Sequence, residues 1–285
     1  MSAGVPARPA RPDPPSVLPR WLWLWLAPAT IVVEFAFHAV RPVAYERWFG
    51  GEHGVIENLT NLFALGGLVV ALALFARRRA VASRLFGPCM LVIALGCFVF
   101  AGEEMSWGQH LLGFEVPEGI AARNDQGELN LHNDPVLEPL FDFWARNTLS
   151  WAALIGGVIL PIVRQRRGRG TPDIASPSLW GWAIPTILCV PTALTVIAVT
   201  LPPRAFGLMH VATPYPFPWN IPWSESKEYD LALLILVYVL TLLRYVPGRG
   251  AASVAGRAAA LPEGSAKSAV SPDRPMGGPQ ASSSA

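Results

Sequence analysis

Six apolar stretches near membrane-spanning length restrict what this sequence can fold into. Each approaches the roughly 20 residues that an α-helix needs to cross about 30 Å of hydrocarbon. The stretches are Trp21 to Val40, Val55 to Ala76, Phe86 to Trp107, Phe143 to Val163, Leu179 to Leu201 and Leu231 to Val246. The chain is 52% hydrophobic and only 15% charged, which is too apolar for an ordinary soluble domain. We therefore predict an all-α, polytopic membrane helical bundle with about six transmembrane helices.

The basic residues predict how this bundle is oriented. Most of the 22 Lys and Arg residues lie in four segments on one side of the predicted helices. The positive-inside rule places this side, and with it both termini, in the cytoplasm. The basic residues in the remaining segments are Arg41, Arg47, Arg123, Arg146, Arg204 and Lys227. Because the charges are spread over four segments, we expect the lipid bilayer as partner and no nucleic acid, with the cell inner membrane as location.

Composition also divides the chain into a membrane domain and two tails. Residues 1–20 are rich in proline, and residues 247–285 are rich in Gly, Ala, Ser and Pro. Such segments do not form a packed core, so we predict two disordered cytoplasmic tails. The six-helix domain then covers residues 21–246, with periplasmic loops at residues 41–54, 108–142 and 202–228.

Ionisable side chains are costly in hydrocarbon, so their depth in the predicted helices is informative. Glu34 and His38 lie one turn apart on the first helix, near its outer end. Glu57 enters the second helix at about the same level, and Glu103 and Glu104 lie close to the outer end of the third. Three acidic residues mark the outer start of the sixth helix: Glu225, Glu228 and Asp230. We predict a polar layer beneath the periplasmic surface, in which Glu34 and Glu57 meet near Glu103 or Glu104.

The segment "AGEEMSWGQHLLGFE", residues 101–115, carries the strongest candidate site. If the third helix continues through His110, then Glu103, Ser106 and His110 form one stripe, while Glu104 points to a neighbouring face. Two adjacent carboxylates in a low dielectric should not both stay charged. They would share a proton, a cation or an arginine, which is the chemistry of a proton donor, a metal ligand or a buried ion pair.

The loop after this segment contains "NDQGELNLHND", in which Asn130, His132 and Asn133 are close together. We expect this loop to fold back over the outer mouth of the bundle, because it is the nearest source of donors for the carboxylate pair. A divalent metal is then a candidate cofactor. Its candidate ligands are Glu103, Glu104, His110 and His132, with Glu34 and His38 as further choices. Established motifs such as HExxH, CxxC and GxSxG are absent from the sequence.

These residues also carry a resemblance. "GEEMSWGQHLLGFEVPE" and the later "QGELNLHN" resemble an uncharacterised group of bacterial multi-pass membrane proteins that share Glu-Glu-x-Ser-Trp-Gly-Gln and Asn-Leu-His-Asn. "GEHGVIENLT" resembles that group's Glu-x-Gly-x-x-Glu segment, so the likeness covers roughly residues 45 to 135. The resemblance implies a membrane protein but no particular reaction. This chain has His110 where we expect Arg, which weighs against an arginine-bridged carboxylate pair.

The glutamate pair is also similar to the first motif of CAAX-type membrane proteases. That family has Arg four residues after the second Glu, where this chain has Gly108. The similarity is therefore weak and partial.

Three function classes remain open. The first is a membrane-embedded hydrolase or transferase for a lipid or lipid-linked substrate, with Glu103 or Glu104 as acid or base and His110 or His132 as ligand or proton partner. The second is a non-catalytic assembly or sensory protein. The third is a proton-coupled small-solute transporter, which needs polar groups at mid-depth and often has repeated halves; the sequence shows no internal repeat and no charge near the predicted bilayer centre. The residues that we expect to support the site are Glu34, His38, Glu57, Ser106, Gln109, Asn130 and Asn133.

Overall fold

The computed structural model describes residues 18–50, 54–124, 127, 129–130, 136 and 146–248. All regular secondary structure in these ranges is helical, which confirms the predicted all-α membrane bundle. Five helices are long and apolar enough to cross a membrane: Trp21–Val40, Val55–Ala76, Phe86–Glu104, Asn147–Arg166 and Ile187–Leu208. A sixth long helix, Trp223–Tyr245, is polar in its first two turns. Most of both predicted tails lies outside the described residues.

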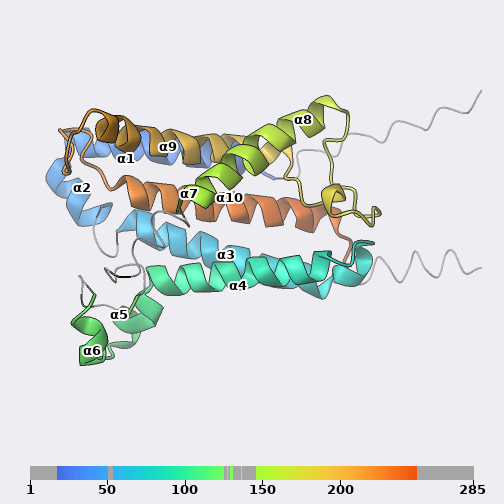
Figure 1. Ribbon diagram of the computed structural model, residues 1–285, viewed down its shortest axis with the longest axis horizontal. Coiled ribbons are helices and arrows are strands. Elements are labelled where there is room, and N and C mark those ends of the chain that lie inside the picture. Colours follow the sequence, from blue (N-terminus) through green and yellow to red (C-terminus); the bar gives the residue numbers. More distant parts are fainter. Residues whose placement is uncertain are drawn as a thin grey trace, which may run out of the picture. The chain divides into compact units, whose positions relative to one another are not determined.

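The long helices follow one another with short helical pieces between them (Figure 1). The long ones, with the π-helical pieces that extend two of them, are η1 (Trp21–Trp25), α1 (Leu26–Val40), α3 (Val55–Ala76), α4 (Phe86–Glu104), α7 (Arg146–Ala152), η5 (Ala153–Ile159), α8 (Leu160–Arg166), α9 (Val190–Leu208) and α10 (Trp223–Tyr245). The short ones are α2 (Pro42–Trp48), η2 (Arg78–Ala80), η3 (Ser106–Gly108), α5 (Gln109–Leu112), α6 (Glu118–Ala121), η6 (Leu179–Gly181) and η7 (Ile187–Cys189).

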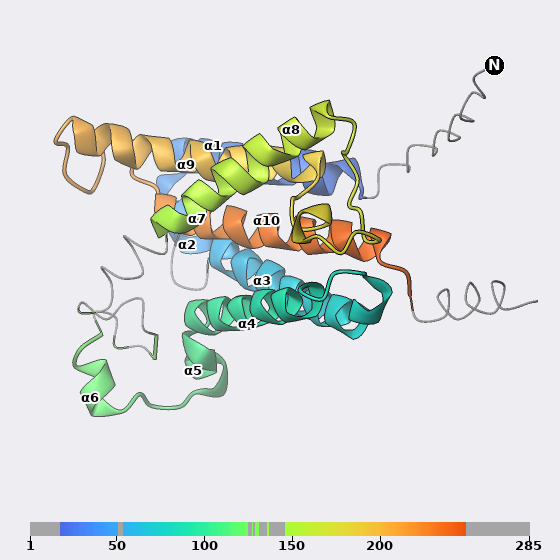
Figure 2. The same ribbon diagram turned by 45° about the vertical axis from the view of Figure 1, so that its right-hand side comes forward.

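Helix α10 lies at the centre of this bundle. It packs against α3 on one side and against α9 on the other, and α3 packs against α4 (Figures 1 and 2). Tyr229, Leu233 and Val237 of α10 are fully buried in the largest apolar cluster. Gly67 of α3 allows close approach to α4, because a Cβ there would lie 3.0 Å from the sulfur of Cys97. Small residues at helix contacts are typical of membrane bundles.

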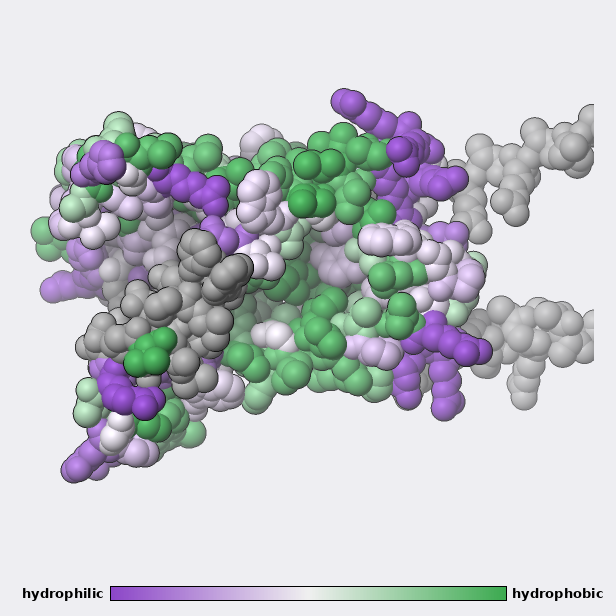
Figure 3. Space-filling view, in the orientation of Figure 1, coloured by the Kyte–Doolittle hydropathy of each residue, from purple (hydrophilic) through white to green (hydrophobic). Residues whose placement is uncertain are grey.

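The outer surface of the helices is apolar. Val69 is 65% exposed, Val92 70% and Leu95 62%. On the face shown in Figure 3, hydrophobic side chains cover the middle of the helices, and hydrophilic side chains gather at both ends. A surface of this kind is stable only against lipid. The chain is therefore a multi-pass membrane protein.

The third helix ends earlier than the sequence predicts. Helix α4 stops at Glu104, and the next turn has left-handed backbone at Ser106, Trp107 and Gly108, with φ of 44°, 53° and 83°. Gly108 adopts this conformation without strain, and it separates α4 from α5. The predicted stripe of Glu103, Ser106 and His110 is therefore wrong, because the helix does not continue through His110.

The fifth and sixth helices are also displaced from their predicted positions. The predicted span Leu179 to Leu201 begins instead at Ile187 and continues to Leu208. Helix α10 begins at Trp223, well before Leu231. Both ends of the predicted loop 202–228 are therefore helical, since α9 continues to Leu208 and α10 begins at Trp223, and the loop 41–54 contains α2.

Arg164 explains why the apolar segment before Ile187 is a loop and not part of a helix. Its guanidinium donates to five backbone carbonyl oxygens, which satisfies peptide groups that a helix would otherwise pair. The carbonyls belong to Arg169, Thr171, Trp180, Gly181 and Ile184.

Candidate functional site

The most buried carboxylate with hydrogen-bond donors is Glu34, on α1. Its side chain is 0% exposed. The hydroxyl of Tyr45 donates to Glu34 Oε1 at 2.8 Å. Ser226 Oγ, on α10, lies 2.9 Å from both carboxylate oxygens. Three segments of the chain thus meet at one carboxylate.

The position of Tyr45 follows from a break in the chain after α1. Arg41 has φ −140° and ψ 62°, which ends α1, and Pro42 at the first position of α2 starts a new helix. This turn directs Tyr45 back against α1, where the ring is 0% exposed and packs edge-on to His38 at 4.7 Å. Burial and the nearby Glu34 raise the pKa of Tyr45 well above its usual range. Tyr45 is therefore a neutral donor at physiological pH.

His38 extends the site towards the C-terminal end of α1. It lies one turn above Glu34 and is 1% exposed. His38 Nε2 lies 2.9 Å from Asn220 Oδ1, in the segment before α10. Since the amide oxygen only accepts, Nε2 carries the proton, and Nδ1 has no partner among the described residues.

A second carboxylate, Asp230, lies deeper on α10. It is 0% exposed and close enough to Glu34 to interact electrostatically. The hydroxyl of Thr195 is also near, but it donates to the Thr192 carbonyl oxygen at 2.7 Å. Neither oxygen of Asp230 has a hydrogen-bond partner within the described part of the chain. An uncompensated buried charge is very costly, so this carboxyl is best accommodated in its neutral form.

Glu225 lies in the first turn of α10, ahead of the apolar part that begins at Leu231. Its Oε2 is buried and has no partner among the described residues. Four other carboxylates surround it: Glu228, Glu57, Glu34 and Glu46. Burial and these like charges raise the pKa of Glu225 to about 8. Glu225 can therefore gain or lose a proton near neutral pH.

A pair of hydroxyls continues the polar contacts towards the other end of α1. Thr30, one turn from Glu34, donates to the Leu26 carbonyl oxygen at 2.8 Å. It therefore accepts from Tyr229, whose hydroxyl lies 2.9 Å away. Thr30, Glu34 and His38 share one face of α1. We call the set Glu34, His38, Tyr45, Asn220, Ser226 and Asp230 the α1–α10 site.

The end of α4 holds a second group of polar side chains. The indole of Trp107 donates to Glu103 Oε1 at 2.8 Å, and Glu103 is 6% exposed. The left-handed turn permits this return of Trp107 over the helix end. Gly102 leaves room for the ring, because a Cβ there would lie 2.8 Å from it. Glu104 is half-buried.

Part of the long loop returns to this end of α4. The Asn130 amide lies 3.2 Å from Ser106 Oγ, and the Leu129 backbone N–H donates to Gln109 Oε1 at 2.9 Å. Asn124 holds the returning segment by donating to Asn130 Oδ1 at 2.7 Å. We call Glu103, Ser106, Gln109, Asn124 and Asn130 the α4-end cluster.

The remaining predicted site residues are described only in part. His132 and Asn133 lie outside the described residues, as does the side chain of His110, so their approach to Glu103 or Glu104 stays a prediction. Glu57 is half-buried and lies near Glu225. Among the described side chains, no group of three or more His, Cys, Asp and Glu could hold a metal ion. The metal site proposed from sequence also stays a prediction.

Sequence reasoning placed Glu34 and His38 in a polar layer but missed their partners. Tyr45 stands in a predicted loop, and only Pro42 three residues earlier signals the helix that carries it. Ser226 precedes the predicted sixth span and had no predicted role, and Asp230 was placed in the polar layer at the start of that span without a partner. A helical pattern from Trp223 onwards, with Ser226 and Asp230 one turn apart, is the signal that could have found both.

Comparison of the chain with protein families, with curated proteins and with solved structures finds no match. The geometry of the α1–α10 site and of the α4-end cluster therefore carries the functional argument.

Proposed function

We propose that this protein is a proton-coupled small-solute transporter of the cell inner membrane, with Glu34 and Asp230 as its proton-binding groups. The observation that carries the proposal is the pair of fully buried carboxylates on α1 and α10, of which, within the described part of the chain, Glu34 alone has hydrogen-bond donors. Ionisable groups inside a membrane bundle are costly and mark ion or proton pathways.

The unequal surroundings of the two carboxylates assign their resting states. Glu34 accepts from Tyr45 and Ser226, and these hydrogen bonds favour its charged form. Asp230 has no such donor among the described residues that meets the hydrogen-bond geometry, and its burial favours the neutral form that holds a proton. One negative charge and one proton then occupy the pair, and a proton can pass between the two carboxyls when the bundle rearranges.

Ser226 allows Glu34 to change its charge without losing a hydrogen bond. When Glu34 is charged, Ser226 donates its hydroxyl proton to the carboxylate. When a proton binds Glu34, the carboxyl donates to Ser226 Oγ, and Ser226 donates to the Pro222 carbonyl oxygen, which lies 3.4 Å away. Glu225 lies on the side from which such a proton would come.

Infrared difference spectra of the full chain in lipid nanodiscs test this proposal. We expect a protonated carboxyl band that disappears in Asp230→Asn, and a pH-dependent carboxylate band that disappears in Glu34→Gln. Glu118→Gln is the matched control, because Glu118 is exposed on α6. In proteoliposomes with an internal pH dye, both site variants should lose proton uptake that the control retains. Wild-type spectra and uptake in both site variants would refute the proposal.

A second candidate function rests on the α4-end cluster. Leu129 and Asn130 fold back onto Gln109 and Ser106, so part of the loop covers the helix end that carries Glu103. A roofed carboxylate is suited to acid–base chemistry, which supports a hydrolase or transferase for a lipid or lipid-linked substrate.

The test of this second function uses the loop histidine. His132→Ala and Glu104→Gln should impair the same activity, or the same bound metal, while the protein stays folded. Normal metal content and full complementation of a deletion strain by both variants would remove the enzymatic interpretation. Neither His132 nor Glu104 is among the residues that define the α1–α10 site, so the two proposals are tested with different variants.

A further inference from the structure

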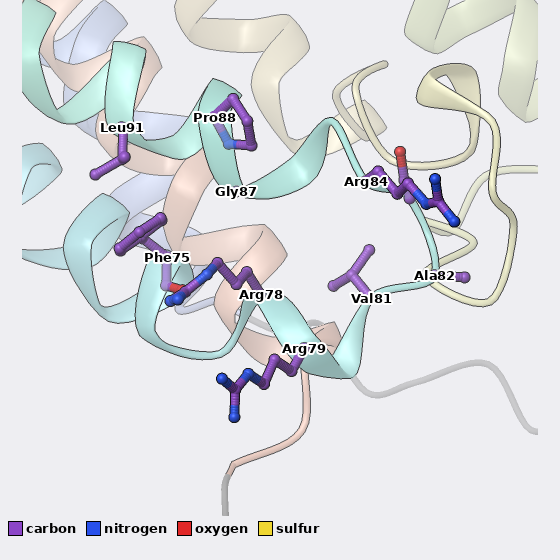
Figure 4. Close-up of a pocket in the computed structure, with 10 residues that line it drawn as sticks. Phe75, Arg78, Arg79, Val81, Ala82, Arg84, Gly87, Pro88 and Leu91 are labelled. Carbon is purple, nitrogen blue, oxygen red and sulfur yellow. The ribbon is translucent and has the colours of Figure 1, made fainter.

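A pocket of about 650 Å³ lies at the turn between α3 and α4, at the opposite end of α3 from Glu57 (Figure 4). Arg78, Arg79 and Arg84 line it together with apolar side chains, among them Phe75 and Leu91. The positive-inside rule predicts that this end faces the cytoplasm. The pocket thus combines three cations with an apolar wall at a membrane boundary.

The three arginines differ in how firmly they are held. The Arg78 guanidinium lies 4.1 Å above the Phe75 ring and donates to the Phe75 carbonyl oxygen at 3.0 Å. Gly87 lets this side chain cross the first turn of α4, because a Cβ there would lie 2.9 Å from Arg78 Cδ. Arg79 and Arg84 are exposed and have no hydrogen bond or ion pair among the described residues. In Figure 4 they extend on different sides of Val81.

A buried donor is also present. Ser83 lines the pocket and is 3% exposed, yet its Oγ has no partner within the described ranges. A buried hydroxyl without a partner costs free energy, and an acceptor in the pocket would remove this cost. The backbone beside it is fixed, because the Ala82 N–H donates to the Ile174 carbonyl oxygen at 2.9 Å.

We propose that this pocket binds the phosphate headgroup of an anionic phospholipid. Arg79 and Arg84, whose exposed side chains extend apart in this structure, would turn towards the phosphate, and Ser83 would donate a hydrogen bond to it. Phe75 and Leu91 would contact the start of the acyl chains. Basic pockets between helices on the cytoplasmic side of a membrane are suited to such headgroups. A free phosphate shares the charge but cannot use the apolar wall, so the lipid is the ligand to which the proposal commits.

Native mass spectrometry of the full chain tests the proposal. The protein is released from detergent in the presence of phosphatidylglycerol, of phosphatidylcholine or of inorganic phosphate alone. We expect retention of phosphatidylglycerol, little of phosphatidylcholine and none of phosphate. Each arginine near the membrane surface contributes about fivefold to the binding of an anionic lipid, so Arg79→Ala/Arg84→Ala should reduce retention about 25-fold. Ser83→Ala should reduce it roughly tenfold, the effect of one hydrogen bond to a charged group.

The control is the double variant Arg166→Ala/Arg167→Ala, which removes two exposed arginines from the end of α8 on the same predicted side. It should retain phosphatidylglycerol like the wild type. An equal loss in this control would show that total charge, and not the pocket, holds the lipid. Equal retention of phosphatidylcholine, or equal occupancy by phosphate, would also refute the proposal. Ser83→Ala keeps every arginine, so an unchanged retention there refutes the proposal even if the arginine variant does not fold.

Discussion

Replacing Asp230 by Asn should stabilise this protein, and the gain should grow with pH. In the unfolded chain Asp230 is exposed and loses its proton above about pH 4. In the folded bundle it is fully buried without a donor and keeps the proton. The unfolded state therefore binds fewer protons, so wild-type stability falls as pH rises, by roughly 1.4 kcal/mol per pH unit. Asn does not titrate, so Asp230→Asn should gain little over the wild type at about pH 4 and should gain roughly 1.4 kcal/mol per pH unit above it for as long as the folded wild type keeps the proton.

Reversible unfolding by dodecyl sulfate, followed by tryptophan fluorescence, can measure this difference between about pH 4 and pH 8. Glu34→Gln provides the contrast, because Tyr45 and Ser226 both donate to Glu34. In Gln, an amide NH2 group replaces one carboxylate oxygen and cannot accept from one of these two donors. The free energy of unfolding of this variant should therefore be lower than that of the wild type by about 1–3 kcal/mol. A stability difference for Asp230→Asn that does not change with pH would show that Asp230 carries the same charge in both states. The assignment of the proton to Asp230 would then be wrong.

Three other variants or fusions test further parts of the structure. Tyr45→Phe should lower the free energy of unfolding by about 1.5–3 kcal/mol, because it removes a hydrogen bond to a carboxylate. The free energy of unfolding of the wild type should also fall above about pH 10, because the unfolded state ionises Tyr45 while the folded state does not. In Tyr45→Phe this fall should be smaller. Arg164→Lys keeps the charge but cannot reach five carbonyls, so limited trypsin digestion should cut the loop between α8 and η7 faster than in the wild type. A reporter fused after Ala76 should be cytoplasmic and one after Val116 periplasmic; the inverse pattern would reverse the predicted orientation.

Hydrophobicity alone predicted the helices whose ends coincide with a change in composition. The span Val55 to Ala76 has the same bounds in the structure, because Gly54 precedes it and a run of arginines follows it. The same reasoning placed the first span at Trp21 to Val40. It failed where polar groups are buried. The start of α10 contains Glu225, Lys227, Glu228 and Asp230, which lower its hydropathy although the bundle buries Asp230 completely.

The candidate sites show what a single sequence can and cannot predict. Helical spacing placed Glu34 and His38 on one face of the first helix, and both are buried in the bundle, while their depth in the membrane stays a prediction. Helical spacing could not predict which side chains meet them, since Tyr45 depends on the turn at Pro42, and Ser226 depends on the packing of α10 against α1. At the end of α4 the left-handed turn at Ser106 and Trp107 overrode helical periodicity. Neither residue favours positive φ, so no local signal predicted it.

The separation between the α1–α10 site and the apolar cluster at the other end of the bundle affects how membrane voltage acts on the protein. Leu74, Phe86, Met90 and Val239 are all 0% exposed and fill that end with hydrocarbon. An electric potential falls mainly across layers of low polarisability. A proton that binds Glu34 from the polar end therefore crosses only a small share of the field. A proton that left through the apolar cluster would cross most of the field. Its free energy would then change by roughly 2.3 kcal/mol for each 100 mV of membrane potential. If the protein moves protons as we propose, voltage should thus change their release at that end much more than their binding at Glu34.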